Sequence, residues 1–168
     1  NTLAANTTGS NNAGVGYRAL YSNTSGASNN AQGVNALYSN TTGSYNTGVG
    51  QAALRTNTTG NYNTAVGQAA LFNATTASNN TAMGAQSLFA NTTGRENSSV
   101  GFQSLYNNTT GSFNNAQGAY ALNKNTTGIK NTAVGQAAMR ANTTGNQNVA
   151  IGQNTMRASN SSFNTGIG

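Results

Sequence analysis

Residues Asn57 to Asn73 read Asn-Thr-Thr-Gly-Asn-Tyr-Asn-Thr-Ala-Val-Gly-Gln-Ala-Ala-Leu-Phe-Asn, and this seventeen-residue unit recurs along the whole chain. We number positions within the unit as registers, from register 1 at the first Asn to register 17. A fixed short period indicates stacked structural units and not a single globular core. Residues 1–168 therefore form one repeat array, with a partial coil 1–5, full repeats 6–22, 23–39, 40–56, 57–73, 74–90, 91–107, 108–124, 125–141 and 142–158, and a partial coil 159–168.

The composition of the chain favours an ordered, non-enzymatic rod. Only 5% of residues are charged and proline is absent, whereas disordered segments of low hydrophobicity usually carry high charge and proline. There is no Cys and no His, and the single acid, Glu96, cannot form an acid–base pair. The absence of repeated Asp argues against a calcium-binding roll. We predict no enzyme activity, no metal and no cofactor, and no apolar run reaches the roughly 18 residues of a membrane span.

The repeat predicts an all-β parallel solenoid of about ten coils. Gly recurs at registers 4 and 11 with Asn and Thr between, and these residues are poor helix formers. We expect extended segments at registers 6–10 and 12–16, a sharp corner at the register 11 Gly, and a second turn at Asn-Thr-Thr-Gly with its Gly in the left-handed conformation. Coils about 4.8 Å apart would give a rod on the order of 48 Å long.

The register 7 asparagines are predicted to form a ladder, each amide bonding the amide of the next coil. The partial last copy is one turn residue shorter, which aligns Asn164 with this register. The predicted ladder comprises Asn12, Asn29, Asn46, Asn63, Asn80, Asn97, Asn114, Asn131, Asn148 and Asn164. The predicted corner glycines at register 11 are Gly16, Gly33, Gly50, Gly67, Gly84, Gly101, Gly118, Gly135, Gly152 and Gly168.

The predicted core is thin. We expect one Leu or Met at register 15 and one mostly apolar residue at register 10, such as Val66, to stack in columns. The register 15 residues are Leu20, Leu37, Leu54, Leu71, Leu88, Leu105, Leu122, Met139 and Met156. Registers 7 to 11 are restricted on both faces, although a strand with one solvated face would vary at alternate positions. This restriction predicts contact with further copies of the chain, most simply in a homotrimer.

Aromatic side chains gather at registers 16 and 6, on either side of the Asn-Thr-Thr-Gly turn. The register 16 set, a candidate contact stripe, is Tyr21, Tyr38, Phe72, Phe89 and Tyr106. The favoured interpretation is that they pack beneath the turn or at a chain–chain contact, and the functional alternative is that they stack on glycans. Burial or display of registers 6 and 16 distinguishes the two interpretations.

Three further patterns have ordinary explanations. Asn-Thr-Thr is an N-glycosylation sequon, as at Asn40 and Asn57, but the same residues are favoured in turns. Thr rows including Thr42 and Thr59 could template ice, although a turn is a poor flat plane. The seven Lys and Arg residues fall on five registers, which does not predict the basic face of a nucleic-acid-binding protein.

The segment Asn63 to Leu71 resembles the head repeats of trimeric autotransporter adhesins, which are written around Ser-Val-Ala-Ile-Gly-x-x-Ala; Asn148 to Gly152 is the nearest match. The whole chain resembles more closely the tandem repeats of tail-fibre-like proteins of phages and bacteria. These resemblances imply a left-handed parallel β-roll, three chains side by side, and an extracellular location or one on a cell or virion surface.

We therefore predict a structural solenoid that builds an extracellular fibre or filament. Its partners would be copies of itself, side by side or head to tail, because neither end shows an atypical capping repeat. The alternative is an adhesin or tail-fibre segment that binds host surface glycans through the aromatic stripe, and a minor alternative is an ice-binding solenoid.

Overall fold

The computed structural model describes residues 1–168, and it confirms an all-β parallel solenoid with one strand in each coil. The strands occupy registers 8–10 and pair in parallel in sequence order, so that Thr64 lies beside Thr81 and Val66 beside Met83. The strands are β1 (Ala13–Val15), β2 (Asn30–Gln32), β3 (Thr47–Val49), β4 (Thr64–Val66), β5 (Thr81–Met83), β6 (Ser98–Val100), β7 (Asn115–Gln117), β8 (Thr132–Val134), β9 (Val149–Ile151) and β10 (Thr165–Ile167).

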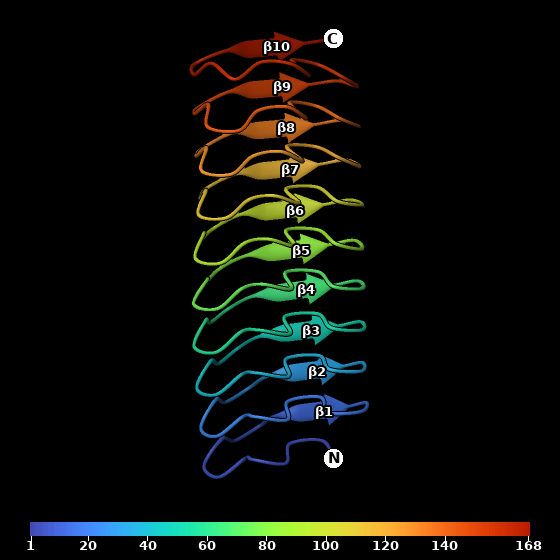
Figure 1. The fold of residues 1–168 in the computed structure, drawn as a ribbon, viewed down its shortest axis with the longest axis vertical. Coiled ribbons are helices and arrows are strands. Elements are labelled where there is room, and N and C mark those ends of the chain that lie inside the picture. Colours follow the sequence, from blue (N-terminus) through green and yellow to red (C-terminus); the bar gives the residue numbers. More distant parts are fainter.

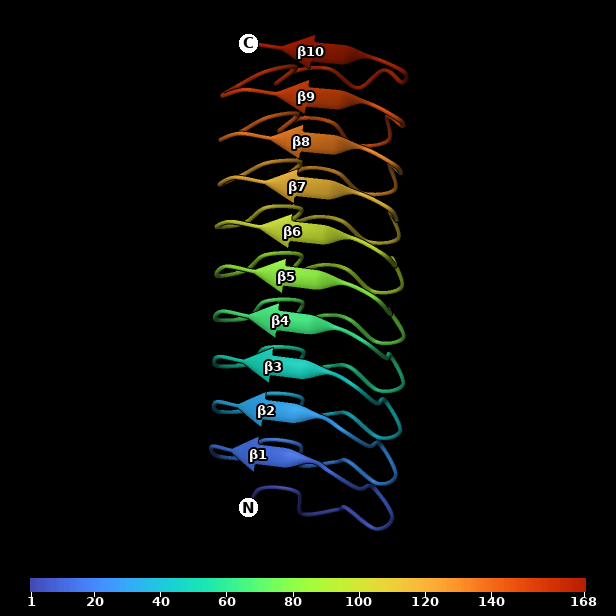
Figure 2. The ribbon, with the colours of Figure 1, turned by 180° about the vertical axis from the view of Figure 1, so that it is seen from behind.

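The coils climb along one axis, with the N-terminus and C-terminus at opposite ends of the rod (Figure 1). Seen from the side on which the strands face the viewer, the strands run from right to left as the chain rises (Figure 2). This path is a left-handed coil. No helix of the chain has the length and apolar character needed to cross a bilayer.

Hydrogen bonds along the axis hold the turns as well as the strands. Of 113 backbone–backbone hydrogen bonds, 18 lie within the regular strands and 95 involve other segments. Many of these 95 join the same or adjacent registers of neighbouring coils, such as the bond from the Leu54 N–H at register 15 to the Ala70 carbonyl at register 14, at 3.0 Å. Most of the perimeter is therefore bonded from coil to coil, which satisfies backbone groups that a short three-residue strand would leave unpaired.

The expected second extended segment at registers 12–16 is wrong. These registers form a turn in which registers 13 and 15 take positive φ, as at Ala69 (53°) and Leu71 (51°). A left-handed Leu is locally disfavoured. It is held here because the Leu71 N–H bonds the Ser87 carbonyl of the next coil at 2.9 Å and the side chain enters the buried interior.

The Asn-Thr-Thr-Gly turn also differs from the expectation. Its left-handed residue is at register 6, as at Tyr62 (φ 58°), and not at the register 4 Gly. Register 4 needs Gly for a steric reason. At Gly43, an added Cβ would lie 2.5 Å from Asn40 Oδ1 and 2.5 Å from the Gly60 carbonyl oxygen. The register 11 glycines do take positive φ, from 123° at Gly152 to 149° at Gly168.

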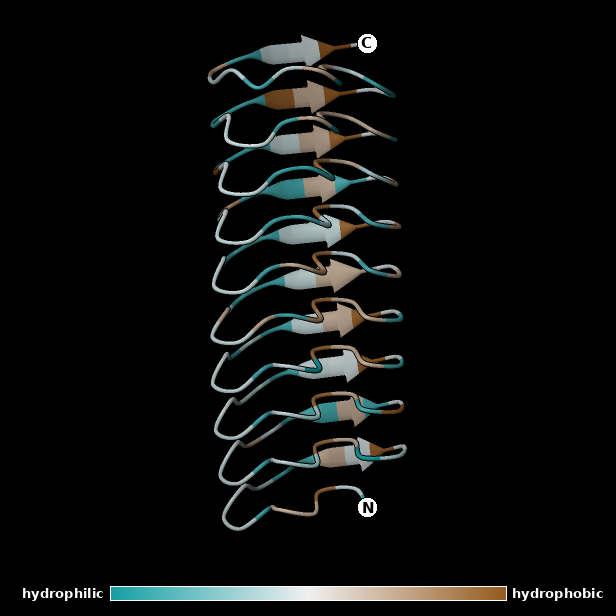
Figure 3. Ribbon diagram, viewed as in Figure 1, coloured by the Kyte–Doolittle hydropathy of each residue, from teal (hydrophilic) through white to brown (hydrophobic).

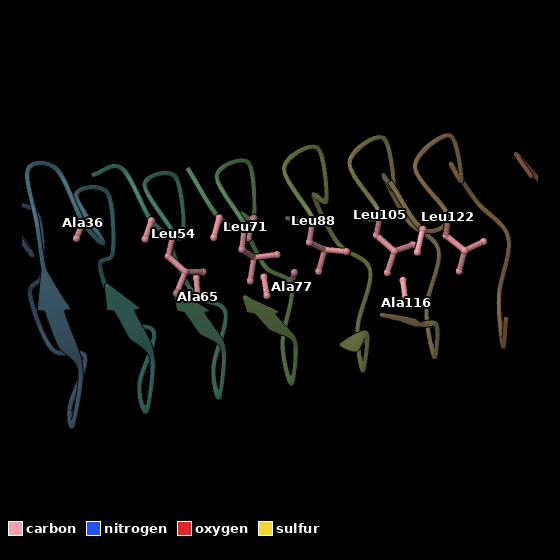
Figure 4. Packing of buried hydrophobic residues seen from close by; sticks show 14 of the residues in the cluster. Ala36, Leu54, Ala65, Leu71, Ala77, Leu88, Leu105, Ala116 and Leu122 are labelled. Atoms are coloured by element: carbon pink, nitrogen blue, oxygen red, sulfur yellow. The ribbon is translucent and has the colours of Figure 1, made fainter. Parts of the chain in front are cut away.

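The core consists of Leu or Met at register 15 and small residues at registers 9 and 14. The leucine side chains of successive coils lie in a row inside the rod, with alanines such as Ala65 and Ala116 beside them (Figure 4). All the register 15 residues from Leu20 to Met139 are fully buried, and Met156 packs against the cluster while partly buried.

The expected burial of register 10 is wrong. Within each three-residue strand, side chains alternate between the faces of the sheet. The register 9 residue points inward, so registers 8 and 10 point outward: Ala82 is buried whereas Met83 is 44% exposed. Hydrophobic segments still recur at the same places in successive coils (Figure 3). Those at the ends of the strands, such as Val100 and Ile151 at register 10, lie on the surface.

Candidate functional site

A continuous asparagine ladder runs through the interior at register 7. The Asn63 side-chain Nδ2 donates to Asn46 Oδ1 at 3.1 Å and to the Ala77 carbonyl at 2.8 Å. Asn63 Oδ1 in turn accepts from the backbone N–H of Asn80 at 3.1 Å and from its Nδ2 at 3.2 Å. Each amide therefore joins two neighbouring coils and also fixes a turn.

The register 7 ladder has no gap from Asn12 to Asn164. Its first step is the bond from Asn29 Nδ2 to Asn12 Oδ1 at 3.1 Å, and its last is the bond from Asn164 Nδ2 to Asn148 Oδ1 at 3.0 Å. The asparagines between these ends are at most 2% exposed. A buried amide is costly without partners, so this row stabilises the rod only because every member is bonded.

A second asparagine ladder at register 1 was missed by the sequence analysis, which assigned this Asn to the turn alone. Asn40 Nδ2 donates to Asn23 Oδ1 at 2.7 Å and to the carbonyl of its own turn, Gly43, at 2.9 Å. The signal was present in the sequence, because register 1 is Asn in all full repeats except one. One side chain serves both the turn and the ladder, and composition alone does not separate the two roles.

The second ladder is interrupted at Ala74, and the interruption is matched at Ala77. Asn57 Oδ1 is buried and has no hydrogen-bond partner, because the next member of the row is Ala74. In other coils the register 4 residue is Gly, where a Cβ would overlap the oxygen of the register 1 Asn in the same turn. Loss of the amide at Ala74 thus makes room for the methyl group of Ala77.

We predict that this pair is energetically coupled. Ala74→Asn alone should destabilise the rod because its Oδ1 would meet the Ala77 methyl group, and Ala77→Gly alone should destabilise it by about 1 kcal/mol through cavity and glycine entropy. The double variant completes the ladder and gives Asn57 Oδ1 a donor. Urea melts of all four chains should give a favourable coupling of about 1–3 kcal/mol; strict additivity would contradict the steric explanation.

The sequon asparagines of the inner coils are inaccessible in the folded rod. Asn40, Asn57 and Asn108 are 0% exposed, and their Nδ2 atoms donate to the ladder and to their own turn. An N-linked glycan needs this nitrogen. The turn explanation therefore holds for these residues.

The candidate contact stripe at register 16 forms columns of stacked rings on one edge of the rod. Tyr21 and Tyr38 lie 5.4 Å apart, and Phe89 lies 5.1 Å from both Phe72 and Tyr106, with interplanar angles of 17° or less. Arg55 fills the coil between the two groups, with its guanidinium 5.7 Å from the Tyr38 ring and 5.5 Å from the Phe72 ring.

These rings are half-buried, and their faces stack against the rings of neighbouring coils. At register 6, Tyr45 and Tyr62 are more exposed, at 55% and 58%, but they also stack, at 4.9 Å and 1°. Sugar rings bind to free aromatic faces, and each ring in a stack loses one face to every stacked neighbour. The arrangement favours packing along the rod over glycan binding.

The outer face of the sheet is an uncharged, partly apolar surface made by registers 8 and 10. Register 10 exposes Val15, Met83, Val100, Ile151 and Ile167 by 40% or more. No Lys, Arg, Asp or Glu occurs at either register in any coil. We call this surface the outer sheet face.

The threonine rows do not form a flat array. Thr42 and Thr59 at register 3 are exposed but lie in the turn. Register 8 on the flat outer sheet face carries Thr in five of the ten strands, and Asn30 and Ser98 are among the residues that interrupt it.

Comparison of the chain with protein-family models, with curated proteins and with solved structures found no match in any of the three. The geometry of the ladders and of the outer sheet face is therefore the basis for inferring what the chain does.

Proposed function

We propose that the chain is a structural element that builds a fibre by association with further copies of itself. The outer sheet face is the observation that carries this proposal. It runs the length of the rod and exposes apolar side chains such as Val100 (40%) and Ile151 (43%) at register 10, a row that only Gln32 and Gln117 interrupt. An uncharged surface with exposed apolar side chains of this kind is typical of protein–protein contacts.

The distribution of charge supports the same proposal. All seven basic residues and Glu96 lie in the turns, at registers 5, 6, 13, 16 and 17. Two outer sheet faces can therefore approach without placing like charges opposite one another. Charge is depleted in the cores of protein interfaces for this reason.

The hydrogen bonds of the interior support a mechanical role for the rod. Two rows of asparagine amides and the backbone bonds of most of the perimeter run parallel to the axis. Stretching the rod would break many of these bonds together. A long β-solenoid with such ladders suits a fibre that must keep its length.

Extracellular location and a trimeric assembly are part of the proposal. The location comes from the resemblance to adhesin heads and tail fibres, and the trimer comes from that resemblance and from the restriction of registers 7 to 11 on both strand faces. Head-to-tail stacking also stays a prediction. Immunogold labelling of intact cells or particles that carry the protein tests the location. Label confined to the interior would contradict it.

Lysines on the outer sheet face should prevent association. We expect the wild-type chain to scatter light with a multiple of the 17.0 kDa mass of one chain, and a trimer would give three times that mass. Met83→Lys combined with Ile151→Lys should give the single-chain mass, because buried like charges oppose contact. Both side chains are already more than 40% exposed in the single rod, so the circular dichroism spectrum should change little.

The matched control places two lysines at the same four-coil spacing on exposed turn residues, Thr42→Lys with Thr110→Lys. This variant should retain the wild-type mass. A monomeric wild-type chain at high concentration, or an equal loss of association in the control, would rule out the outer sheet face as the contact.

A further inference from the structure

Three basic residues that are dispersed in the sequence meet on one edge of the rod. Lys124 is the last residue of its repeat, and Arg140 and Arg157 occupy register 16 of the next two repeats. Backbone bonds place them in successive coils, since the Lys124 N–H donates to the Arg140 carbonyl at 3.1 Å and the Ala141 N–H donates to the Arg157 carbonyl at 2.9 Å. Together with Ala141 they line a hollow of about 200 Å³.

The charge of this cluster is not balanced by a nearby side-chain carboxylate. Glu96 is the only acidic residue, and it lies at register 6 of an earlier coil, on a different turn from register 16. Cations in neighbouring coils of a parallel stack repel one another, as like charges do across adjacent strands. The cluster therefore concentrates positive charge, which a bound anion would balance.

Arg140 supplies a second, independent observation. Its Nε–H is buried and has no hydrogen-bond partner, while its guanidinium lies 5.1 Å from the centre of the Tyr120 ring. The ring limits how the guanidinium can turn. Unsatisfied buried donors are rare in folded proteins, and this one belongs to a residue that lines the hollow.

We propose that the hollow of Lys124, Arg140 and Arg157 binds a phosphate or sulfate group. The planar guanidinium donates paired N–H groups that fit two oxygens of such a group, and a lysine ammonium adds a flexible point charge. The group is either a free inorganic ion or an ester carried on a polymer. Arg55 occupies the same register as Arg140 but lies between two aromatic rings and has no basic neighbour at that register, so it provides a matched control.

The test is a titration of the ¹⁵N-labelled chain, followed by NMR, with sodium phosphate, sodium sulfate and a defined heparin oligosaccharide in separate arms at constant ionic strength. We expect saturable shifts at the Arg140 Nε–H and at the amides of Lys124, Arg140 and Arg157 in at least one arm. Arg157→Gln should weaken the apparent affinity by tenfold or more, Arg157→Lys by less, and Arg55→Gln by less than twofold. The arm that saturates at the lowest concentration identifies the source of the group.

Shifts that rise linearly in every arm, or an equal loss of affinity in Arg55→Gln, would overturn the proposal, because both results describe general screening of charge. A thermal melt of each variant separates loss of binding from loss of folding. If Arg157→Gln does not fold, Lys124→Gln is the second variant. It should weaken binding by threefold or more, and unchanged binding in Lys124→Gln would also overturn the proposal.

Discussion

Asn63→Ala should destabilise the rod by about 3–5 kcal/mol, one of the two largest effects that we expect from a single substitution. The Asn63 side chain bonds Asn46 Oδ1 and the Ala77 carbonyl, and its own oxygen accepts two bonds from Asn80. Truncation removes all four bonds. It leaves the buried N–H of Asn80 and the carbonyl of Ala77 without these partners, and each such loss costs about 1–3 kcal/mol.

The effect should also reach beyond one coil. Each coil of a solenoid contacts only its neighbours, so stability is a sum of coil terms and coupling terms. Asn63 carries part of the coupling between three successive coils, 40–56, 57–73 and 74–90. We expect a lower urea midpoint and a broader transition, since the two halves of the rod become less coupled.

The control for this prediction is Asn73→Ala. Asn73 is the last residue of the same coil, lies away from the outer sheet face, and is replaced by Ala in other coils, as at Ala90. The substitution should change the free energy of unfolding by less than about 0.5 kcal/mol, as at most surface positions. Urea melts followed by circular dichroism compare the two variants. Equal effects for Asn63→Ala and Asn73→Ala would contradict a stabilising role for the ladder.

Gly50→Ala should destabilise the rod by about 3 kcal/mol or more, whereas Gly48→Ala, two residues earlier, should be tolerated. Gly50 has φ 125°, and a Cβ there would lie 2.6 Å from the carbonyl oxygen of Gly67 in the next coil. Backbone strain alone costs about 1–3 kcal/mol for a side chain in such a conformation, and the backbone contact adds to it. The neighbouring coil cannot yield without breaking its own bonds.

Gly48 occupies the inward register 9, where most coils carry Ala. Its added Cβ would meet the Ala53 carbonyl at 3.3 Å and Leu37 Cγ at 3.5 Å, which needs only a small adjustment. The gain of a buried methyl group offsets this adjustment, so the free energy of unfolding should stay within about 0.5 kcal/mol of wild type or rise. If Gly48→Ala and Gly50→Ala were equally destabilising, the corner would not be the special position that the structure shows.

The sequence predicted the coil, its period and its parallel stacking, because any residue type needed in one coil is needed again seventeen residues later. Gly stands at register 11 in every coil, which indicates a position with positive φ, and the structure shows positive φ at Gly67 and its equivalents. Asn stands at register 7 in every coil, which indicates a partner in the neighbouring coil, and Asn63 is bonded to Asn46 and Asn80 as expected. Repetition makes such constraints readable from a single sequence.

Three features could not be predicted, for physical reasons. An apolar residue such as Val66 was expected inside, but the interior is so narrow that only the small register 9 residue of each strand fits there. The left-handed Leu71 contradicts local preference and is imposed by bonds to the next coil. The basic cluster was also missed, because Lys124 and Arg140 carry different registers yet become neighbours when register 17 of one coil meets register 16 of the next.

Electron microscopy of the purified wild-type chain tests the central claim, self-association into a fibre, most directly. The proposal predicts particles wider than one rod, with several rods side by side and their outer sheet faces turned toward one another. The variant Met83→Lys with Ile151→Lys should show single rods on the order of 48 Å long, from the spacing of stacked strands. Single rods in the wild-type sample at every concentration would contradict the proposal.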